Sequence, residues 1–238
     1  MELKDCDIVY VAKNSPANEE LRYSLRSLQN IPHRKVFIVG GCPMFINKRT
    51  VKHIPVAQKL GNKWLNTSSL LKVIVNNQEI SDNFILFNDD FFVWNEIDKL
   101  PYYHDRTLSS RIMDFAKISW YTTMNGYCSR LKGASRALKF NKKKVLNFEL
   151  HLPIILNKSK LSQIFKEYPS IGAKRSLYCN HYEVESLQHK DVKIYDMDSV
   201  PEQDWDFVST SDASFAMGKV GKVIKKRFRQ TSKYERKK

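Results

Sequence analysis

The chain has 238 residues, of which 42% are hydrophobic, so it is long enough and apolar enough for one large packed domain. Its four cysteines lie far apart without a CxxC pair, which argues against a zinc knuckle or a dense disulfide framework and indicates a reducing, cytoplasmic setting. No run approaches the roughly 20 apolar residues of a membrane span, and the first residues lack the pattern of a signal peptide. With 40 Lys and Arg against 25 Asp and Glu, the net charge is +15, which favours a polyanionic partner.

The beginning of the chain reads as a strand followed by a helix. Residues 6–12 (CDIVYVA) form a short apolar run with the composition of a buried strand. In the segment 14–32, Ser15 or Asn18 can cap a helix, Pro16 suits a first helical turn, and three leucines recur at helical spacing. This segment is therefore predicted to be a helix.

The same alternation continues. Strands are predicted at 34–41, which ends in two glycines, and at 51–57. Residues 66–80 carry a capping group and an apolar stripe and are predicted to form a helix, and 81–93 (SDNFILFNDDFFV) forms the next strand. The order strand, helix, strand, strand, helix, strand is typical of an α/β domain with a mostly parallel sheet and right-handed crossovers.

Three polar residues, Asn88, Asp89 and Asp90, interrupt the apolar strand at 81–93. Burying an unpaired carboxylate costs roughly 3 kcal/mol or more, so we expect an Arg or Lys, a ring of backbone N–H groups or a divalent cation to neutralise these acids. In such sheets ligands bind outside the carboxyl ends of the strands, which is where the acids fall. Paired oxygen ligands there suit Mg²⁺ or Mn²⁺ together with substrate phosphates. The alternative is a strand that ends in a polar turn, with one acid capping the next element of the chain.

Several segments resemble, in order, the GT-A-fold nucleotide-sugar transferases, in particular the Stealth family of sugar-phosphate transferases and compact phage-type glycosyltransferases. The similar segments are 7–43, 80–92 (ISDNFILFNDDFF), 151–161 (HLPIILNKSKL), 174–178 (KRSLY) and 228–235 (FRQTSKYE). The chain departs from the Stealth pattern at 11–14, where VAKN replaces a segment ending in Val-Asp-Gly, and in the missing proline of the last segment. These departures count against sugar-phosphate transfer more than against the fold.

The resemblance implies a Rossmann-like GT-A fold and a metal-dependent glycosyltransferase that moves a sugar from a nucleotide diphosphate sugar, with a UDP-sugar as the expected donor and Mn²⁺ or Mg²⁺ as the cofactor. Two alternatives stay open. One is a Stealth-like sugar-phosphate transferase acting on a capsule or wall glycan. The other is a non-catalytic nucleic-acid-binding protein. The two acids at the strand edge argue against this alternative, because they would repel phosphate.

The chemistry assigns roles near the carboxylates, because the leaving diphosphate needs positive charge beside it. Asp90 is the expected metal ligand, and Asp89 is a second ligand or a catalytic contact to the sugar. Two arginines lie four residues apart on one helix face, and a lysine precedes the next helix, where backbone N–H groups can hold phosphate. The expected donor-binding residues are Val9, Tyr10, Arg22, Arg26, Lys63 and Asn88.

Four later residues complete the predicted site. A lone histidine such as His151 in an apolar run is more often structural, and the resemblance instead implies a role on the diphosphate, the metal or the acceptor hydroxyl. Arg175 is expected to contact phosphate, and His181 is expected to be a late metal ligand. Asp212 resembles the acid of the last family segment, and its alternative is a helix N-cap.

The domain organisation follows from these assignments. We expect a nucleotide-sugar-binding half at 1–100, an acceptor-side half at 101–218 and a basic tail at 219–238. The tail holds ten basic residues and one acid, and a second cluster at 130–144 holds seven basic residues and no acid. Each cluster alone would most simply be a solvated face.

Two clusters in one chain favour an acceptor that is itself polyanionic, bound through counterion release. We expect DNA carrying a hydroxymethylated base, flipped toward the carboxylates, in preference to an anionic wall polymer. The chain carries no RNP, KH or Cys/His finger motif that would read bases. The phage-type resemblance implies action in the cytoplasm of a host cell.

Overall fold

The computed structural model describes residues 2–58, 63–118 and 124–236. The chain forms two compact units. Unit 1 consists of Met1–Leu100, His151–Lys158 and Val192–Lys238, and unit 2 consists of Pro101–Leu150 and Ser159–Asp191. No helix among the described residues combines the length and the hydropathy that crossing a membrane requires.

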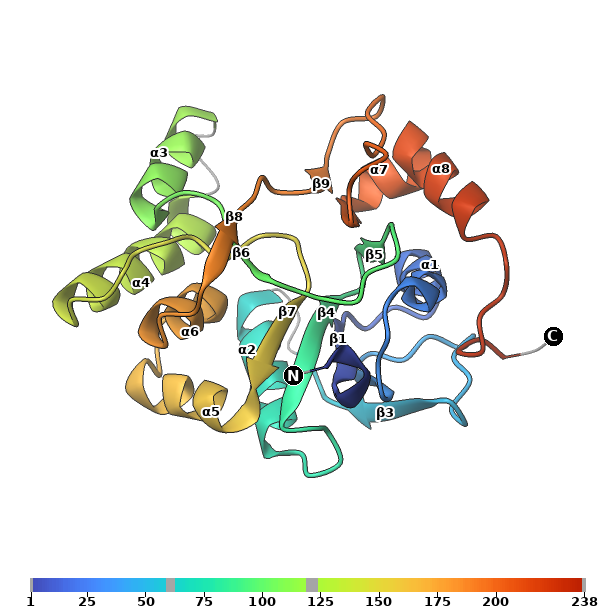
Figure 1. Ribbon diagram of the computed structural model, residues 1–238, viewed down its shortest axis with the longest axis horizontal. Coiled ribbons are helices and arrows are strands. Elements are labelled where there is room, and N and C mark those ends of the chain that lie inside the picture. The colour runs from blue at the N-terminus through green and yellow to red at the C-terminus, as the bar shows by residue number, and fades with distance from the viewer. Residues whose placement is uncertain (1, 59–62, 119–123, 237–238) are drawn as a thin grey trace. The chain divides into compact units, whose positions relative to one another are not determined.

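A five-stranded sheet forms the centre of unit 1 (Figure 1). Its strands, in the order in which they lie side by side, are β3 (Val51–Pro55), β2 (Val36–Gly40), β1 (Asp7–Ala12), β4 (Asn83–Asn88) and β7 (Ile154–Asn157). The first four run parallel, and β7 runs antiparallel to β4. The predicted α/β fold with a mostly parallel sheet is therefore confirmed.

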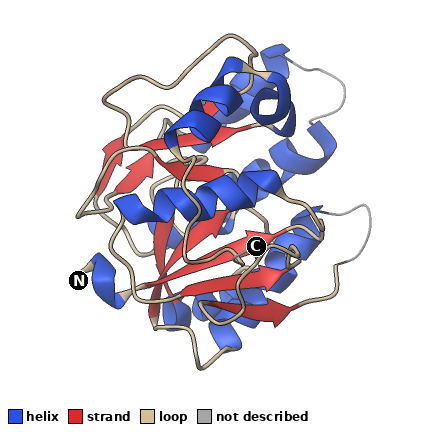
Figure 2. Ribbon diagram, turned by 90° about the vertical axis from the view of Figure 1, so that its right-hand side faces the viewer, coloured by secondary structure: helices blue, strands red, loops and turns tan. Residues whose placement is uncertain are grey.

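The strands β1 and β2 are apolar because both faces of the sheet are covered, and nearly all of their residues are buried. The connecting helices are α1 (Glu19–Ser27) and α2 (Lys63–Asn76), and short 3₁₀ turns precede β1 at Leu3–Asp5 and follow α1 at Leu28–Asn30. Figure 2 colours the helices blue and the strands red. The side chain of Asn18 caps α1 by accepting a hydrogen bond from the backbone N–H of Leu21 at 3.1 Å.

The segment predicted as one strand at 81–93 is two strands in two sheets. β4 ends at Asn88, a turn holds Asp89 and Asp90, and β5 (Phe91–Val93) continues in a three-stranded sheet with β10 (Phe207–Thr210) and β9 (Lys193–Ile194). β5 is antiparallel to β10, and β9 is parallel to it. The two acids therefore sit where the chain passes from one sheet to the other.

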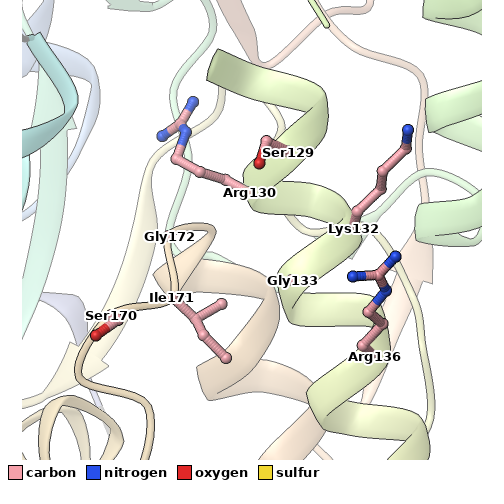
Figure 3. A pocket seen from close by; sticks show the side chains of 8 residues that line it. All are labelled: Ser129, Arg130, Lys132, Gly133, Arg136, Ser170, Ile171 and Gly172. Carbon is pink, nitrogen blue, oxygen red and sulfur yellow. The ribbon is translucent and has the colours of Figure 1, made fainter. Parts of the chain in front are cut away.

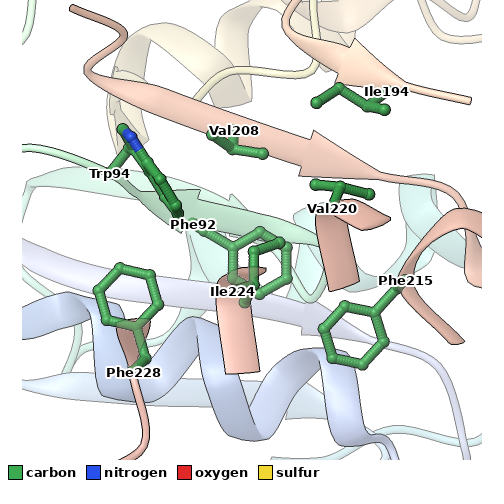
Figure 4. Packing of buried hydrophobic residues seen from close by; sticks show 8 residues of the cluster. All are labelled: Phe92, Trp94, Ile194, Val208, Phe215, Val220, Ile224 and Phe228. Carbon is green, nitrogen blue, oxygen red and sulfur yellow. The ribbon is translucent and has the colours of Figure 1, made fainter. Parts of the chain in front are cut away.

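A hydrophobic cluster joins the small sheet to the helices α7 (Asp212–Met217) and α8 (Lys219–Arg227). Figure 4 shows its side chains pointing toward one another: Phe92, Trp94, Ile194, Val208, Phe215, Val220, Ile224 and Phe228. The rings of Phe92 and Phe215 stack at 5.8 Å and 9°. Burial of such rings is a large apolar contribution to stability, so this cluster is a core of its own.

The segment expected to be a basic tail is instead folded into unit 1. Val220, Ile224 and Phe228 recur every four residues, which places them on the buried face of α8 and turns the lysines outward. Arg227 lies 4.3 Å from the Trp94 ring and donates a hydrogen bond of 2.7 Å to the carbonyl of the same residue. Part of the charge at 219–238 therefore stabilises the fold through cation–π contacts.

Unit 1 also takes in residues beyond the predicted boundary at 100. Residues 151–158 and 192–238 belong to it because β7 pairs with β4 and β10 pairs with β5. Unit 2 contains the parallel pair β6 (Tyr102–His104) and β8 (Ser186–Gln188). Its helices are α3 (Leu108–Ile118), a π-helical turn at Met124–Cys128, α4 (Ser129–Phe140), α5 (Lys158–Glu167) and α6 (Lys174–His181).

The last described residues are anchored to α1 by a buried carboxylate. Glu235 is 3% exposed and accepts two hydrogen bonds of 2.8 Å from the Arg26 guanidinium and one of 3.2 Å from Arg22. Burial acts to raise the pKa of Glu235, but the hydrogen bonds from Arg26, Arg22 and the Ser232 backbone N–H, together with the Arg26 charge, outweigh burial, so the pKa is lowered. A buried ion pair of this kind is costly to break from one side only.

Replacing Glu235 with Gln should lower the free energy of unfolding by about 3 kcal/mol at pH 7, because Arg26 loses its counter-charge and Arg22 keeps only Glu19. Since the folded pKa is depressed, the wild-type contribution is present above the unfolded pKa of about 4.3 and is lost as the pH falls through the folded value. Denaturant titrations between pH 3 and 7 measure both effects. Glu202→Gln, at an exposed position, is the control and should change stability by less than about 0.5 kcal/mol. Equal stability of the two variants at pH 7 would contradict the anchoring role.

Candidate functional site

Polar side chains from distant segments of unit 1 meet beyond the carboxyl ends of β1 and β4. The segments are the loop after β1, the start of α1, the β4–β5 turn, β9, the end of β10 and the start of α7. The acids among them are Glu20, Asp89, Asp90 and Asp212, and the cations are Lys13 and Lys193. We call this set the carboxylate edge. It is the position in which parallel α/β sheets bind ligands.

Asp90 is held by the small sheet. Its Oδ2 accepts a hydrogen bond of 2.7 Å from Lys193 Nζ on β9 and one of 3.0 Å from Ser209 Oγ on β10. Burial acts to lower the pKa of Lys193, but the charge and the hydrogen bond of Asp90, together with smaller contributions from Tyr195 and Glu20, more than offset burial, so the pKa of the ammonium is raised. A lysine is therefore the group that neutralises Asp90 in this structure.

Asp89 is held by the cap of α1. Its Oδ2 accepts a hydrogen bond of 2.7 Å from Asn18 Nδ2, while Asn18 Oδ1 caps the helix. Burial, followed by the charge of Asp90, raises the pKa of Asp89. Asn88, the last residue of β4, is partly exposed beside it and lies opposite Val11 of β1.

Glu20 is a third acid of the carboxylate edge that the sequence did not identify. It is 6% exposed, and its Oε1 accepts a hydrogen bond of 2.9 Å from Thr210 Oγ1. Burial, and after it the charge of Asp90, raise the pKa of Glu20 to about 8. At neutral pH this side chain therefore carries a proton that it can exchange.

Lys13 and Asp212 form a pair at the outer rim of the carboxylate edge. Lys13 Nζ lies 3.0 Å from Asp212 Oδ2, and both side chains are largely exposed. The hydrogen bond from Lys13 lowers the pKa of Asp212. Asp212 is the first residue of α7 and not its cap, because Ser211 forms a capping box with Ser214.

Two glycines let β2 approach the loop that carries Lys13. Gly40 has a φ of 109°, in the region that favours glycine. A Cβ on Gly41 would lie 2.3 Å from the Lys13 carbonyl oxygen, so a side chain there would push the loop away. The glycines predicted to end the second strand thus shape the carboxylate edge.

His151 is connected to the carboxylate edge through one aromatic ring. Its imidazole contacts the Tyr195 ring edge-on at 6.5 Å, and Lys193 Nζ lies 5.6 Å from the centre of the same ring. Tyr195 is 61% exposed. The structure thus brings His151 near the cation that holds Asp90.

Four of the residues predicted to bind the sugar donor have structural contacts instead. The side chains of Val9 and Tyr10 are fully buried, and the Tyr10 hydroxyl lies 2.8 Å from Ser24 Oγ. Arg26 and Arg22 pair with Glu235, and Arg22 also with Glu19. These residues face the core or the C-terminal segment, so the carboxylate edge does not include them. The side chain of Lys63 lies outside the described side chains.

Arg175 and His181 belong to α6 in unit 2. Arg175 Nη1 donates a hydrogen bond of 2.8 Å to the carbonyl of Leu150. His181 Nδ1 lies 3.2 Å from the Tyr168 hydroxyl and 3.5 Å from Glu167 Oε1. The roles of Arg175 on phosphate and of His181 on a metal stay predictions.

The carboxylate edge provides some, but not all, of the oxygen ligands that a hard divalent cation needs. Asp89 and Asp90 offer carboxylate oxygens, which Mg²⁺ and Mn²⁺ prefer. In the part of the chain that the structure describes, no group of three or more His, Cys, Asp or Glu side chains is arranged to hold a metal. Further ligands would therefore come from substrate phosphates and water, as is usual for Mg²⁺. A cation at Asp90 would also compete with Lys193.

Sequence analysis did not identify five residues of the carboxylate edge: Lys13, Asn18 as the hydrogen-bond donor to Asp89, Glu20, Lys193 and Thr210. One signal was present: VAKN replaces a segment ending in Val-Asp-Gly in the resembled family and places a lysine there. Lys193 stands in a short polar segment without a motif, and no local pattern connects it with Asp90, 103 residues away.

No protein-family model matches the chain, and no curated protein matches it. Among solved structures, one of an active-site mutant of LgtC is similar with a TM-score of 0.44 and 9% sequence identity. That alignment covers 79% of this chain and 75% of the other. Similarity at this level does not identify a family, so a functional assignment has to rest on the carboxylate edge.

Replacing Glu20 with Gln should flatten the pH dependence of stability. Between the unfolded pKa of about 4.3 and the folded pKa of about 8, the folded chain holds a proton that the unfolded chain has lost. Wild-type stability should therefore fall as the pH rises through this window, with a limiting slope of about 1.4 kcal/mol per pH unit. Gln keeps the acceptor for Thr210 and removes the titration. Melting temperatures from pH 5 to 9 test this, with the exposed neighbour variant Glu19→Gln as the control. Because the pKa of Asp89 is also raised, part of the slope should remain, and a slope as steep in Glu20→Gln as in the wild-type chain would refute the buried proton on Glu20.

Proposed function

We propose that the chain is a glycosyltransferase that binds a nucleotide diphosphate sugar at the carboxylate edge of unit 1. The observation that supports this most is the meeting of two adjacent acids, Asp89 and Asp90, with the ammonium of Lys193 at the end of a parallel strand. The resemblance of the segments around 7–43 and 80–92 to GT-A transferases points the same way.

The two parts of a nucleotide sugar require binding partners of opposite charge. Its sugar hydroxyls donate hydrogen bonds, which carboxylates accept, and its diphosphate requires cations and N–H donors. The carboxylate edge offers acids at Asp89 and Asp212 beside the ammonium groups of Lys13 and Lys193. A protein that bound only polyanions would gain nothing from four acids at its ligand edge.

The roles follow from position. In transfer, the acceptor hydroxyl attacks the anomeric carbon, the bond to the diphosphate breaks, and negative charge grows on the leaving group. Lys193 and Lys13 are placed to stabilise that charge. Asp89 is assigned to the sugar hydroxyls, and Asp212 orients Lys13. His151 stays a candidate for the acceptor hydroxyl.

A divalent cation is part of this proposal. Asp90, with Asp89 as its neighbour, would hold Mn²⁺ or Mg²⁺, which when bound neutralises the diphosphate. In this structure Lys193 contributes the positive charge at Asp90. With a cation held by Asp90, the Lys193 ammonium would be available to the diphosphate.

The acceptor is proposed to be polyanionic. The net charge of +15 supports this, because an enzyme that modifies a small neutral molecule gains nothing from such a surface. DNA with a hydroxymethylated base is our first choice and an anionic wall polymer the second. Incubation with each acceptor and a set of nucleotide sugars, followed by mass spectrometry, decides between them.

Asp89→Asn should lower transfer or donor hydrolysis at saturating donor by about 100-fold, because a carboxylate contact that acts on developing charge is lost. Asn keeps the shape and an oxygen for Asn18, so the melting temperature should stay within a few degrees of the wild-type value. Release of nucleoside diphosphate is the measurement, and the exposed Asp98→Asn is the matched control. The proposal fails if no nucleotide sugar raises the melting temperature of the wild-type chain, or if Asp89→Asn turns over normally.

Lys193→Gln should bind Mn²⁺ about 10-fold more tightly than the wild-type chain, because an ammonium no longer competes for Asp90. Calorimetric titration with the metal alone measures this independently of activity. The control is Lys219→Gln, whose lysine pairs with the exposed Asp198 at 3.0 Å. Unchanged or weaker Mn²⁺ binding in Lys193→Gln would argue against a metal at Asp90.

A further inference from the structure

Unit 2 contains a basic pocket that the carboxylate edge does not use. Its volume is about 590 Å³, and it lies between α4 and the loop at 170–172 (Figure 3). Three cations line it, Arg130, Lys132 and Arg136, together with the hydroxyl-bearing residues Ser129 and Ser170. None of the described lining residues is acidic. The lining therefore suits an anion.

The pocket is the first part of a longer face of α4. Helical periodicity places Ser129, Gly133, Arg136 and Phe140 in one row, with Lys132 beside it. The opposite face holds the buried residues Leu131, Ala134, Ser135 and Leu138. The row therefore faces away from the packed side of the helix.

Two cations of this face, Lys132 and Arg136, have no counter-charge among the residues that the structure describes. Lys132 and Arg136 stand four residues apart, where like charges repel. Within the described residues neither of them pairs with an acid, whereas Lys143, at the end of the same basic segment, pairs with Glu183 at 3.0 Å. A bound phosphate would relieve the repulsion, and an arginine can bind its oxygens with two parallel hydrogen bonds.

An aromatic ring ends the row. Phe140 is 88% exposed and lies one turn beyond Arg136, about 6 Å along the helix axis at 1.5 Å per residue. A single exposed ring is unremarkable alone. Beside a cationic pocket it provides the second element that single-strand-binding proteins use, a surface on which a base can stack. A wall polymer without bases would have no use for it.

We propose that this face of α4 binds a single-stranded nucleic acid, with a backbone phosphate in the pocket at Lys132 and Arg136 and a base stacked on Phe140. The assignment deepens the proposed function, on which it rests for its biological role, because the bound strand is then the polyanionic acceptor. Binding itself is independent of catalysis and can be measured without a donor.

The first experiment is fluorescence anisotropy with a labelled oligothymidylate at several salt concentrations. The double variant Lys132→Ala, Arg136→Ala should weaken binding at least 10-fold and reduce the slope of log K against log salt by about 0.7, the value for one phosphate contact on a single strand. The matched control removes two exposed cations, also four residues apart, from α8: Lys222→Ala, Lys226→Ala. It should weaken binding less than threefold.

The second experiment separates bases from charge. Phe140→Ala should weaken oligothymidylate binding by 5-fold or more and leave the binding of inorganic polyphosphate unchanged. An equal loss for both ligands, or no loss for either, would overturn the stacking role and favour a base-free polyanion. Wild-type protein that does not bind oligothymidylate at 50 mM salt, or an α8 control as damaging as the α4 variant, would overturn the site itself.

The same variants distinguish this proposal from the proposed function. Thermal shifts with nucleotide sugars should be equal in the wild-type chain and in the α4 variants, because the donor is assigned to unit 1. A chain that binds nucleic acid through α4 and no nucleotide sugar would retain this proposal and refute the glycosyltransferase.

Discussion

The contact between Asp90 and Lys193 is the interaction on which the architecture of unit 1 depends. The turn at Asp89 and Asp90 carries the chain from the large sheet into the small one, and β9 must lie beside β10 for Lys193 to reach 2.7 Å from Asp90. Without that ammonium, a buried acid would stand next to a second acid, at a cost of several kcal/mol. The small sheet and the carboxylate edge therefore require each other.

The remaining acids follow from this arrangement. Glu20 is buried close to Asp90 and so holds its proton to about pH 8, and Asp89 accepts a hydrogen bond from a neutral donor, the amide of Asn18. Only Asp212 lies outside, paired with Lys13 in solvent. The carboxylate edge thus combines a deep, partly protonated part with a charged rim, and this combination suits the proposed donor, which carries hydroxyls and phosphates.

The positive charge has more than one use. Arg26 and Arg22 hold Glu235, and Arg227 packs on Trp94, so a share of the basic residues stabilises unit 1. The cations of α4 differ from these structural cations, because they lie beside a pocket and an exposed aromatic ring. Net charge alone could not separate these uses, since a lysine in a salt bridge and a lysine facing solvent count equally.

The sequence by itself determined the mostly parallel sheet, the position of Asn88, Asp89 and Asp90 at the carboxyl end of its strands, and the two glycines at the end of β2. These features depend on local pattern, namely apolar runs, caps and the end of a strand, and burial of both sheet faces makes that pattern readable. The sequence indicated that some group neutralises the acids, and it left open whether that group is an Arg or Lys, a ring of backbone N–H groups or a divalent cation. The four-residue spacing of Val220, Ile224 and Phe228 was also visible in the sequence. The many lysines around these residues nevertheless led to the prediction of a basic tail and not of a helix with a buried face.

Only the tertiary structure decided which residues meet. Lys193 reaches Asp90 across 103 positions, Thr210 reaches Glu20 across 190, and Glu235 reaches Arg26 across 209. Such pairs depend on the strand order and on the return of 151–158 and 192–238 to unit 1, which no local periodicity encodes. The buried state of Val9 and Tyr10 and the pairing of Arg22 and Arg26 were likewise settled by packing, because a side chain's partners are set by the elements that cover it.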